Sequence, residues 1–550
     1  MKSRDASDIV LIGNAIFTGL EDAPFAGAVA VSGNRITRVV RGREEALQLA
    51  GEGKKVYQCG DRLIMPGFID AHTHFFNGAV AASTHMCMEI EKSTSEAECV
   101  EMMRRFAAAH PDEKRLLGQG WFPANWHDAP LPTKKSLDAA FPHIPVYLIC
   151  ADSHTAWLNT PALEECGIDE NTEVEYGAIV KGEDGKPNGL LIEMEAVAYA
   201  FGKVLSFPAP VMRAVVLGFL EKLADSGITG ISDMMPYPLN GDTERLFGGV
   251  KALDEAGEMT TRLYLYSNLG TTGDYRKELE MAARLSSGKV RYGGLKQFVD
   301  GVTSTHTGFL LEPYTDRPDT CGFTNYSKGV FMRCTAAANA AGLGVRLHCI
   351  GDGAVRWALD CFEAANRTNG NEGNAKGLTN CVEHAESIHP DDIPRFRKLG
   401  VVMSSQPYHL TLDADEKIRR IGPDRCRYEW PHRSFLDAGA VLALGTDFPV
   451  VDFDPFKNIY SAVTRCDDQG NPTGANSEEV LTLAETLKAY TRGSACAYGT
   501  QAELGTLEEG KIADVIVVDR NLFAIPAADI LKCRVDLTLF DGKAVQERGF

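Results

Sequence analysis

The sequence predicts an α/β protein: a (β/α)8 TIM-like barrel with a small β-sandwich domain built from both chain ends and an insertion after barrel strand 1. Three observations support this fold. Short β-rich runs occupy both ends of the chain, and eight short apolar runs alternate with helical stretches between them. About 150 residues separate the first of these eight runs from the second.

Both chain ends have the pattern of antiparallel β-structure. Near the N-terminus, apolar runs such as Ile9–Ile12 are separated by glycine and asparagine turn residues. Near the C-terminus, Val515–Val518 follows a glycine-containing stretch and precedes a hairpin-like pair of runs. We therefore expect residues 1–62 and 500–550 to form one composite β-sandwich domain, and residues 63–499 to form the barrel.

The middle of the chain alternates apolar strands with helices, and eight parallel strands are the number that closes such a barrel. The first connection is far longer than a βα unit needs, so residues at about 76–215 must hold an insertion. The eight expected strands are Leu63–His72, Ile228–Asp233, Arg262–Ser267, Val290–Phe298, Gly344–His348, Asn380–His384, Val401–Ser405 and Val441–Asp447.

The composition is that of a soluble globular protein, with 550 residues, 44% hydrophobic residues and a formal net charge of −19. An acidic chain without a Lys/Arg-rich run repels phosphate backbones and anionic lipids, so we expect neither nucleic-acid nor membrane partners. No stretch reaches the roughly 18 apolar residues of a membrane-spanning helix, and the N-terminus lacks a secretory apolar segment. The 14 cysteines contain no C-x-x-C pair, which favours a reduced, cytoplasmic protein.

Four histidines and an aspartate fall at the ends of expected strands. His72 and His74 end the first strand, and their i, i+2 spacing directs both imidazoles to one face. His348 ends the fifth strand, His384 the sixth and Asp447 the eighth. Each has an ordinary explanation on its own, because H-x-H pairs occur by chance and strand-end histidines are often only hydrogen-bonded. Together, at the barrel end where active sites lie, they predict a metal site.

Lys296 lies near the end of the fourth expected strand, among apolar neighbours. An unpaired ammonium is costly to bury there, so two interpretations are open. The lysine forms an ion pair with Asp300, or its desolvated amine has a lowered pKa and adds CO2 to become an anionic carbamate.

At these positions the sequence resembles the amidohydrolase superfamily, and within it the amidohydrolase-3 branch of YtcJ-like and N-substituted formamide deformylase-like proteins. The resemblance covers almost the whole chain, and its many short motifs follow one another in the family's order. They include His72–His74, Gly120-Trp121, Asp152–Asn159, Gly189–Glu193, Leu295–Gly301, His348–Asp352, Glu383–Ala385, Gly445–Val450 and Gly505–Asp514.

The resemblance implies one or two divalent metal ions, most often zinc. By position in the motifs, His72, His74 and Asp447 would hold the more buried ion. The second ion would lie on His348 and His384.

The activity so implied is hydrolysis of a non-peptide C–N bond in a small-molecule amide. A carbamate on Lys296 would bridge the two ions of a binuclear centre. A divalent zinc lowers the pKa of its bound water to about 7, so a metal-bound hydroxide would attack the carbonyl carbon. Asp447, both ligand and carboxylate, would act as the proton shuttle to the departing nitrogen.

Four further residues are candidates for substrate contact: Trp121, His154, Glu193 and His306. His154 is also a candidate catalytic residue, because it lies in the inserted segment and could reach over the pocket. The alternative is a structural histidine beside Trp157.

Other functions remain open on the same metal site. Hydrolysis of a cyclic amide, lactone or ester needs the same nucleophile. Deaminases of this fold commonly carry a glutamate three residues after the fifth-strand histidine, where this chain has Gly351. A non-enzymatic sensor is disfavoured because all six expected metal-binding positions are retained, and a homodimer is one possible assembly.

Overall fold

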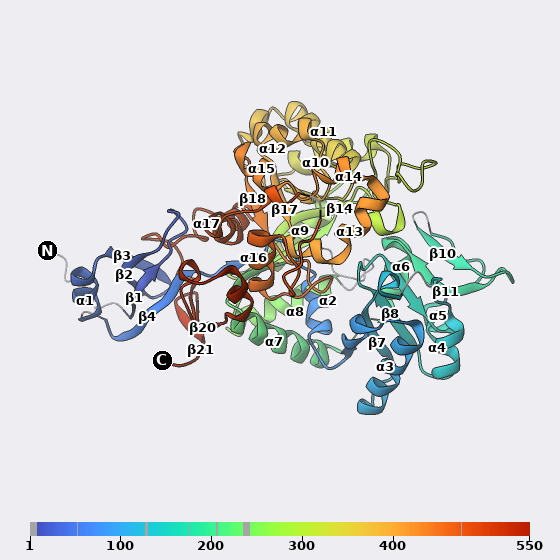
Figure 1. The fold of residues 1–550 in the computed structure, drawn as a ribbon, viewed down its shortest axis with the longest axis horizontal. Coiled ribbons are helices and arrows are strands. Elements are labelled where there is room, and N and C mark those ends of the chain that lie inside the picture. Colours follow the sequence, from blue (N-terminus) through green and yellow to red (C-terminus); the bar gives the residue numbers. More distant parts are fainter. Residues whose placement is uncertain are drawn as a thin grey trace.

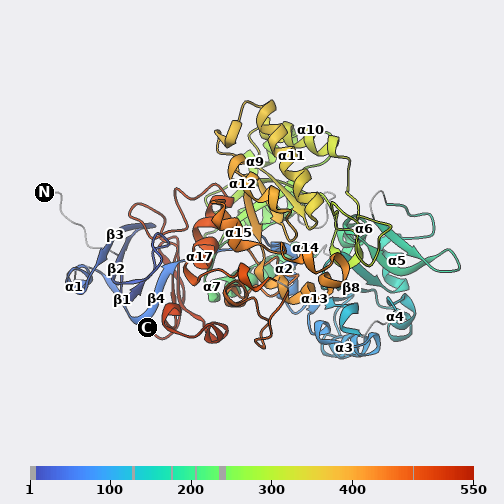
Figure 2. The same ribbon diagram turned by 45° about the horizontal axis from the view of Figure 1, so that its top comes forward.

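The computed structural model describes residues 8–51, 53–126, 130–174, 177–204, 207–234, 243–474 and 476–550. It contains three sheets, which lie side by side along the long axis of the molecule (Figure 1). A seven-stranded sheet carries both chain ends, an eight-stranded parallel sheet lies in the centre, and a six-stranded sheet lies at the far side. Figures 1 and 2 both place the chain-end sheet and the six-stranded sheet on opposite sides of the central one.

The central sheet is the expected (β/α)8 barrel. Its neighbouring strands pair in parallel, and a hydrogen bond from the Ala71 N–H to the Leu444 carbonyl (3.0 Å) joins the two outermost strands. Apolar residues fill the interface between the strands and the surrounding helices because both faces of a parallel sheet are covered. In sheet order the strands are β5 (Phe68–Ile69), β12 (Ile228–Asp233), β13 (Arg262–Asn268), β14 (Val290–Phe298), β15 (Val345–Cys349), β16 (Cys381–His384), β17 (Val402–Ser405) and β18 (Leu442–Leu444).

The helices of the barrel region follow the strands in the chain. They are α7 (Ala209–Asp225), α8 (Thr243–Glu255), α9 (Arg276–Leu285), α10 (Lys328–Ala340), α11 (Asp352–Thr368), α12 (Ile393–Leu399), α13 (Leu410–Ile421), α14 (Pro423–Cys426), α15 (His432–Asp437), α16 (Pro455–Thr464), α17 (Leu483–Lys488) and α18 (Ser494–Ala497), with α2 (Phe75–Ala81) after the first strand.

The first barrel strand differs from the expectation of one strand over Leu63–His72. The chain runs through β4 (Lys55–Pro66) in the chain-end sheet, turns at Gly67, and enters the barrel as the two-residue β5. A Cβ atom at Gly67 would lie 2.3 Å from the Thr229 hydroxyl oxygen, so only glycine allows this close approach. One continuous apolar run therefore serves two sheets.

The chain-end sheet joins strands from the two termini in one hydrogen-bonded array. Alternate residues of the strand Val515–Val518 face different cores: Val515 and Val517 pack with the sheet's own apolar cluster, whereas Ile516 and Val518 pack against the barrel. Helix α1 (Arg43–Gly51) covers part of the sheet. The strand order is β21 (Lys543–Glu547), β20 (Val535–Phe540), β19 (Val515–Val518), β4, β1 (Ile9–Ile16), β2 (Phe25–Ser32) and β3 (Arg35–Arg41).

The insertion forms a mixed sheet of its own, an arrangement that the sequence did not predict. Its separate apolar core is built around three tryptophans, Trp121, Trp126 and Trp157, whose ring centroids lie 5.4–6.3 Å apart. The strand order is β10 (Ala178–Lys181), β11 (Pro187–Ile192), β9 (Thr155–Leu158), β8 (Val146–Cys150), β7 (Leu116–Trp121) and β6 (Met86–Cys87), with helices α3 (Glu96–Ala109), α4 (Lys134–Ala140), α5 (Thr160–Cys166) and α6 (Met194–Val204).

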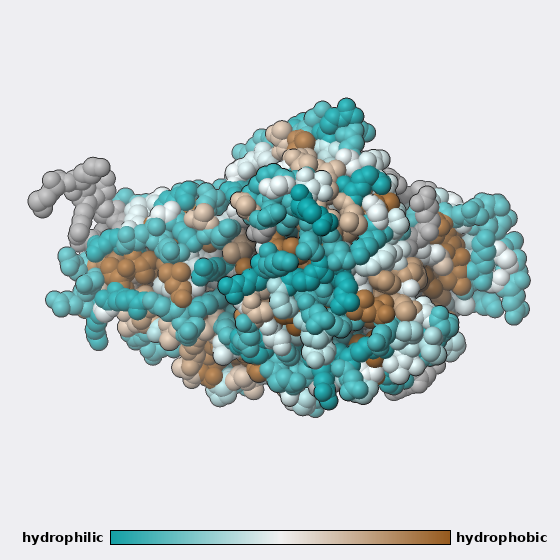
Figure 3. Space-filling view, turned by 90° about the horizontal axis from the view of Figure 1, so that it is seen from above, coloured by the Kyte–Doolittle hydropathy of each residue, from teal (hydrophilic) through white to brown (hydrophobic). Residues whose placement is uncertain are grey.

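Within the described ranges, no helix combines the length and apolar character needed to cross a bilayer. The face seen in Figure 3 is mostly hydrophilic, with separate apolar areas rather than one continuous apolar surface.

A buried ion pair ties the barrel to the chain-end sheet. Arg262 at the start of β13 makes two hydrogen bonds to Asp514 (3.0 and 3.1 Å), and both side chains are almost fully buried. We expect Asp514→Asn to lower the free energy of unfolding by about 3 kcal/mol, because it removes most of the counter-charge of a buried guanidinium. Denaturant unfolding measures this change. As a control, Arg317→Gln removes an exposed pair with Asp319 and should cost less than about 1 kcal/mol; equal losses in the two variants would contradict the expectation.

Candidate metal centre

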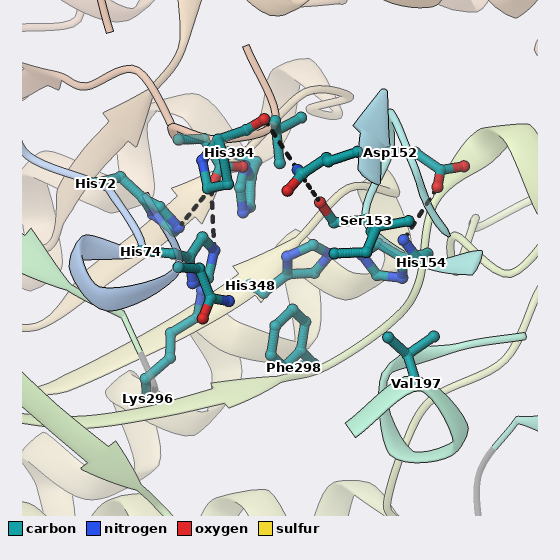
Figure 4. A pocket seen from close by; sticks show the side chains of 16 residues that line it. His72, His74, Asp152, Ser153, His154, Val197, Lys296, Phe298, His348 and His384 are labelled. Atoms are coloured by element: carbon teal, nitrogen blue, oxygen red, sulfur yellow. Dashed lines mark hydrogen bonds and ion pairs between the residues drawn. The ribbon is translucent and has the colours of Figure 1, made fainter. Parts of the chain in front are cut away.

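The structure brings the strand-end residues together around one cavity (Figure 4). His72 and His74 follow β5, and Asp447 follows β18. The other three lie within their strands: Lys296 in β14, His348 in β15 and His384 at the end of β16. All six line the same pocket, because the carboxyl ends of parallel barrel strands converge.

Asp447 is the central carboxylate of the group. Its Oδ1 lies 3.1 Å from His74 Nε2 and 3.5 Å from His72 Nε2. Its Oδ2 lies 3.8 Å from His384 Nδ1 and 3.7 Å from His409 Nε2. The two oxygens therefore face two different sets of imidazoles.

The backbone at these strand ends adopts left-handed angles that residues other than glycine rarely take. The φ angle is +64° at Asp447 and +66° at His384. Such strain persists where the surrounding structure imposes it, and it gathers at functional sites. The strained angles place both side chains at the cavity rather than along the line of their strands.

Lys296 is fully buried, and its Nζ has no hydrogen-bond partner among the described residues. The nitrogen lies 4.8 Å from the centroid of the Phe298 ring. Burial lowers the pKa of Lys296 to about 8, although Glu383 and Asp447 oppose this shift. The amine of Lys296 therefore loses its proton more easily than the amine of an ordinary lysine.

Asp300, the alternative partner of Lys296, is engaged elsewhere. Its carboxyl oxygens accept backbone N–H groups of Phe309, Ile350 and Gly351 at 2.8–3.0 Å. Burial raises the pKa of Asp300 to about 8, against those hydrogen bonds. The pair that the spacing allowed is therefore not formed among the described contacts.

The donor set fits a divalent metal ion. Three buried ligand atoms, His72 Nε2, His348 Nδ1 and Asp447 Oδ1, have no hydrogen-bond partner among the described residues. Burial lowers the pKa of His72 to about 4 and holds the pKa of His348 and His384 well below the usual range. Neutral imidazoles beside an ionised carboxylate are what a zinc-type ion binds.

Outer partners orient two of these histidines. His72 Nδ1 lies 2.5 Å from Glu383 Oε2, and the other oxygen of Glu383 accepts a 2.9 Å hydrogen bond from Arg346. His384 Nδ1 lies 3.0 Å from the Gln406 amide oxygen, which leaves Nε2 of His384 for a metal ion. A carboxylate or carbonyl behind a histidine is the usual support of a metal ligand.

The insertion supplies the opposite wall of the cavity. His154 lines it, and its Nδ1 lies 2.7 Å from Glu193 Oε2. Glu193 is buried behind His154 and accepts hydrogen bonds from Thr305 (3.1 Å) and Thr307 (2.6 Å). Burial by itself lowers the pKa of His154, but the carboxylates of Glu193, Asp152 and Asp447 together raise that pKa above the usual value. Glu193 thus orients His154 rather than lining the cavity itself.

The other two candidates for substrate contact lie outside the cavity lining. Trp121 is fully buried in the core of the insertion, where its indole N–H donates to the Leu148 carbonyl (3.1 Å). His306 pairs with Asp316 (2.9 Å) and packs against the Tyr314 ring.

The cavity has two lobes of about 550 Å³ each, counting the space open to solvent. The first lobe contains His72, His74 and Lys296, and the second contains Glu386 and His409. The residues common to both lobes are Asp152, His154, His348, His384, Asp447 and Val450.

His409 is a site residue that the sequence reasoning missed. It is 6% exposed and is the last residue of the short 3-10 helix Pro407–His409, which follows β17 after Gln406. His384, His409 and Asp447 each offer one ligand atom within 4.8 Å of the others. The available signal was a polar Ser-Gln-Pro stretch directly after an apolar strand, which places a following histidine at the same barrel end as the other ligands.

In a comparison with protein families, residues 55–546 match the amidohydrolase family model. The chain belongs to the amidohydrolase family.

This amidohydrolase is similar to several curated proteins over most of its length. It is 29% identical to Protein LONG AFTER FAR-RED 3 of Arabidopsis thaliana, over 94% of this chain and 88% of that protein. It is 28% identical to the putative amidohydrolase YtcJ of Bacillus subtilis, over 88% of this chain and 89% of that protein. It is 27% identical to the N-substituted formamide deformylase of Arthrobacter pascens, over 95% of both chains.

Solved structures share its fold. An uncharacterized metal-dependent hydrolase from Pyrococcus horikoshii matches with a TM-score of 0.74 and 22% identity, over 94% of this chain and 99% of that one. A second, from Pyrococcus furiosus, matches with a TM-score of 0.70 and 23% identity, over 93% and 99% of the two chains.

Glu383→Gln tests the support of His72 in this amidohydrolase. The amide keeps the shape of the side chain but loses the charge that holds the His72 imidazole, so we expect metal affinity to fall about 10- to 100-fold. Competition with a chromophoric chelator measures the affinity. Glu363→Gln, which changes a partly exposed carboxylate paired with Arg395, is the control and should leave it unchanged. An unaltered affinity in Glu383→Gln would show that the carboxylate does not support the ligand.

Proposed function

We propose that this amidohydrolase is a metal-dependent hydrolase that cleaves the non-peptide C–N bond of a small-molecule amide. The observation that carries the proposal is the convergence of four histidines, Lys296 and Asp447 on one cavity, with buried ligand atoms that lack protein partners. The similarity to an N-substituted formamide deformylase over 95% of both chains supports an amide as substrate.

Two divalent ions, zinc by the nature of the donors, would occupy the centre. His72, His74 and Asp447 would hold one, and His348 and His384 the other. When bound, such ions polarise a substrate carbonyl and lower the pKa of water.

Lys296 would bridge the two ions after CO2 adds to its neutral amine. Its complete burial, the absence of a hydrogen-bond partner among the described residues and its lowered pKa of about 8 favour that addition.

Asp447 would move the proton. Burial alone raises the pKa of its carboxyl group, but the neighbouring His72 and His74 outweigh burial and hold that pKa well below the usual range. The carboxylate is therefore ionised in the resting site and can accept a proton from water. It then passes this proton to the departing amine nitrogen, which leaves a carboxylic acid and an amine as products.

His154 would contact the reacting group from the opposite wall. Because Glu193 faces its Nδ1, the other ring nitrogen is the one left to face the cavity. The His154 and His348 ring centroids lie 5.6 Å apart, so a substrate carbonyl near His348 is within reach of an N–H donor on His154. Such a donor stabilises developing negative charge on the carbonyl oxygen.

Cyclic amides, lactones and esters are the alternative substrates, because the same nucleophile and the same proton acceptor serve them. Deamination is less favoured: the position of the usual deaminase glutamate is Gly351, whose backbone N–H donates to Asp300 (2.9 Å).

Metal content and substrate class can be tested on one preparation. We expect one to two equivalents of zinc or a similar divalent metal by elemental analysis. Removing the metal with a chelator should abolish hydrolysis and adding it back should restore it. Formamides, cyclic amides, lactones and aminopurines are then compared as substrates. Full activity without metal would contradict the mechanism, and release of ammonia from aminopurines alone would favour the deaminase.

Lys296→Ala tests the carbamate. We expect activity to fall by more than the roughly 10- to 100-fold that loss of an outer-shell partner costs, because the bridge itself is removed. Formate, acetate or propionate should restore part of the activity by filling the space with a carboxylate, whereas propionamide should not. Full activity of Lys296→Ala, or equal rescue by propionate and propionamide, would rule out the carbamate.

A further inference from the structure

His409 is a buried histidine of the cavity to which the proposed function gives no role. It lines the second lobe together with three residues of the metal centre, His348, His384 and Asp447. The Ser461 hydroxyl in α16 donates a 2.7 Å hydrogen bond to the Pro407 carbonyl, at the start of the 3-10 helix that ends at His409. Packing of this short helix on α16 therefore fixes the place of the His409 ring.

The Nε2 atom of His409 is buried and has no hydrogen-bond partner among the described residues. The Oδ2 atom of Asp447 lies 3.7 Å away, which is beyond hydrogen-bond range. A polar atom that is buried without a partner is costly. His384, His409 and Asp447 each offer one ligand atom, and the three atoms lie within 4.8 Å of one another. The unpaired nitrogen of His409 thus faces the space that two other ligands face.

The other ring nitrogen of His409 faces a carboxylate. Nδ1 lies 3.5 Å from Glu386 Oε1. The Oε2 atom of Glu386 contacts the ammonium of Lys417, which is buried and also lies 3.2 Å from Glu429 Oε2. A carboxylate on the Nδ1 side favours the tautomer whose proton is on Nδ1, so the lone pair of the ring is on Nε2. This tautomer is the one that binds a metal ion through Nε2.

His72 has the same arrangement of partners. Its Nδ1 lies 2.5 Å from Glu383, whose other oxygen is paired with Arg346, and its buried Nε2 has no hydrogen-bond partner among the described residues. Nε2 of His72 lies 3.5 Å from Asp447 Oδ1, as Nε2 of His409 lies 3.7 Å from Oδ2. Each oxygen of Asp447 therefore faces a histidine that a buried carboxylate and a buried cation support from behind.

A buried histidine with a structural role in the same region is paired instead. His432 is almost fully buried, and its Nε2 shares a 2.8 Å hydrogen bond with the Ser405 hydroxyl at the end of β17. It lines neither lobe of the cavity. An unpaired Nε2 is therefore not a general property of the histidines buried near this strand end.

We propose that His409 is a further metal ligand, which binds through Nε2 the ion that the proposed function places on His348 and His384. The inference rests on the proposed metal-dependent function and adds one residue to its ligand set. Three imidazoles then surround the second metal position, and imidazole suits zinc and related transition metals. Glu386 and Lys417 are the outer partners that orient the added ligand.

His409→Ala tests the ligand through metal binding. We expect the affinity for one zinc equivalent to fall by more than the roughly 10- to 100-fold that loss of an outer partner costs, while any other equivalent is retained. Competition between the zinc-loaded enzyme and a chromophoric chelator measures the affinities. His389→Gln changes a partly exposed histidine outside both lobes and should bind zinc as the wild type does. Unchanged affinities in His409→Ala overturn the proposal, whether the wild type holds one equivalent or two.

Cobalt spectroscopy separates a direct ligand from a residue that acts through another. The visible absorption bands of bound Co²⁺ depend on its ligands, so at saturating Co²⁺ the His409→Ala enzyme should show changed bands. Thermal unfolding, followed by circular dichroism, checks that the variant is folded. A folded variant whose bands match those of the wild type at saturation overturns direct binding by His409.

Two glutamates give a matched pair of variants, and this pair also decides the question if His409→Ala does not fold. Both Glu386 and Glu429 contact Lys417, but in the described contacts it is Glu386 that faces His409. We expect Glu386→Gln to lower the affinity for the same zinc equivalent about 10- to 100-fold, and Glu429→Gln to leave it unchanged. An unchanged affinity in Glu386→Gln, or an equal fall in the two variants, overturns the proposed arrangement.

Failure of this ligand and failure of the proposed function give different results. If the wild-type enzyme binds zinc and hydrolyses an amide but His409→Ala keeps its zinc affinities, the role of His409 alone fails. If the wild type binds zinc and hydrolyses none of the amides compared above, the proposed reaction fails, and the binding measurements still decide the role of His409. A wild-type protein that binds no divalent metal overturns both.

Discussion

The metal centre depends on a buried chain of contacts that runs from Arg346 through Glu383 to His72. All three side chains are fully or almost fully buried, so the charges of Arg346 and Glu383 are stable only because they compensate each other, and Glu383 also holds the uncharged His72 imidazole. Arg346 also donates to the carbonyls of Ala71 (3.1 Å) and Ala497 (2.6 Å), which lie in segments far apart in the sequence. This one guanidinium therefore fixes β15, β16, the residues before His72 and the C-terminal helical region at the same time. The position of His72 therefore depends on the hydrogen bonds that the barrel interior makes to the Arg346 guanidinium.

The two walls of the cavity come from different parts of the fold and have different electrostatic tasks. On the barrel side, burial keeps the imidazoles uncharged and so prepares them for cations. On the insertion side, hydrogen bonds from Thr305 and Thr307 to Glu193, and from Ser304 to Asp152, join the insertion to the loop after β14. The strand that carries Lys296 thus leads directly into the segment that holds the opposite wall. The net charge of −19 describes the whole molecule and says little about this local arrangement.

The barrel and the six strand-end residues follow from the sequence because apolar runs mark the strands and parallel strands gather their ends. The position of His409 in the site was not predicted. This residue lies four positions beyond the end of β17, and the length of a connecting segment does not show where its side chain points. Trp121 was expected to contact substrate because it lies in a family motif. It packs instead in the core of the insertion against Trp126 and Trp157, and those contacts cannot be seen in the motif. The sequence also did not show that the chain passes from one sheet to another at Gly67. An apolar run has the same pattern whether it belongs to one sheet or to two.

The pairing of β4 with β19 has a consequence for synthesis on the ribosome. Residues Leu63–Pro66 pair with Val515–Val518, so about 450 residues separate the two partners. At roughly 5–20 residues per second, the edge of β4 waits on the order of 20–90 s before β19 exists. During that time the nascent chain presents an open strand edge rich in apolar side chains, the kind of surface that attracts chaperones or other nascent chains. The strand that covers this edge of β4 is therefore made long after β4 itself.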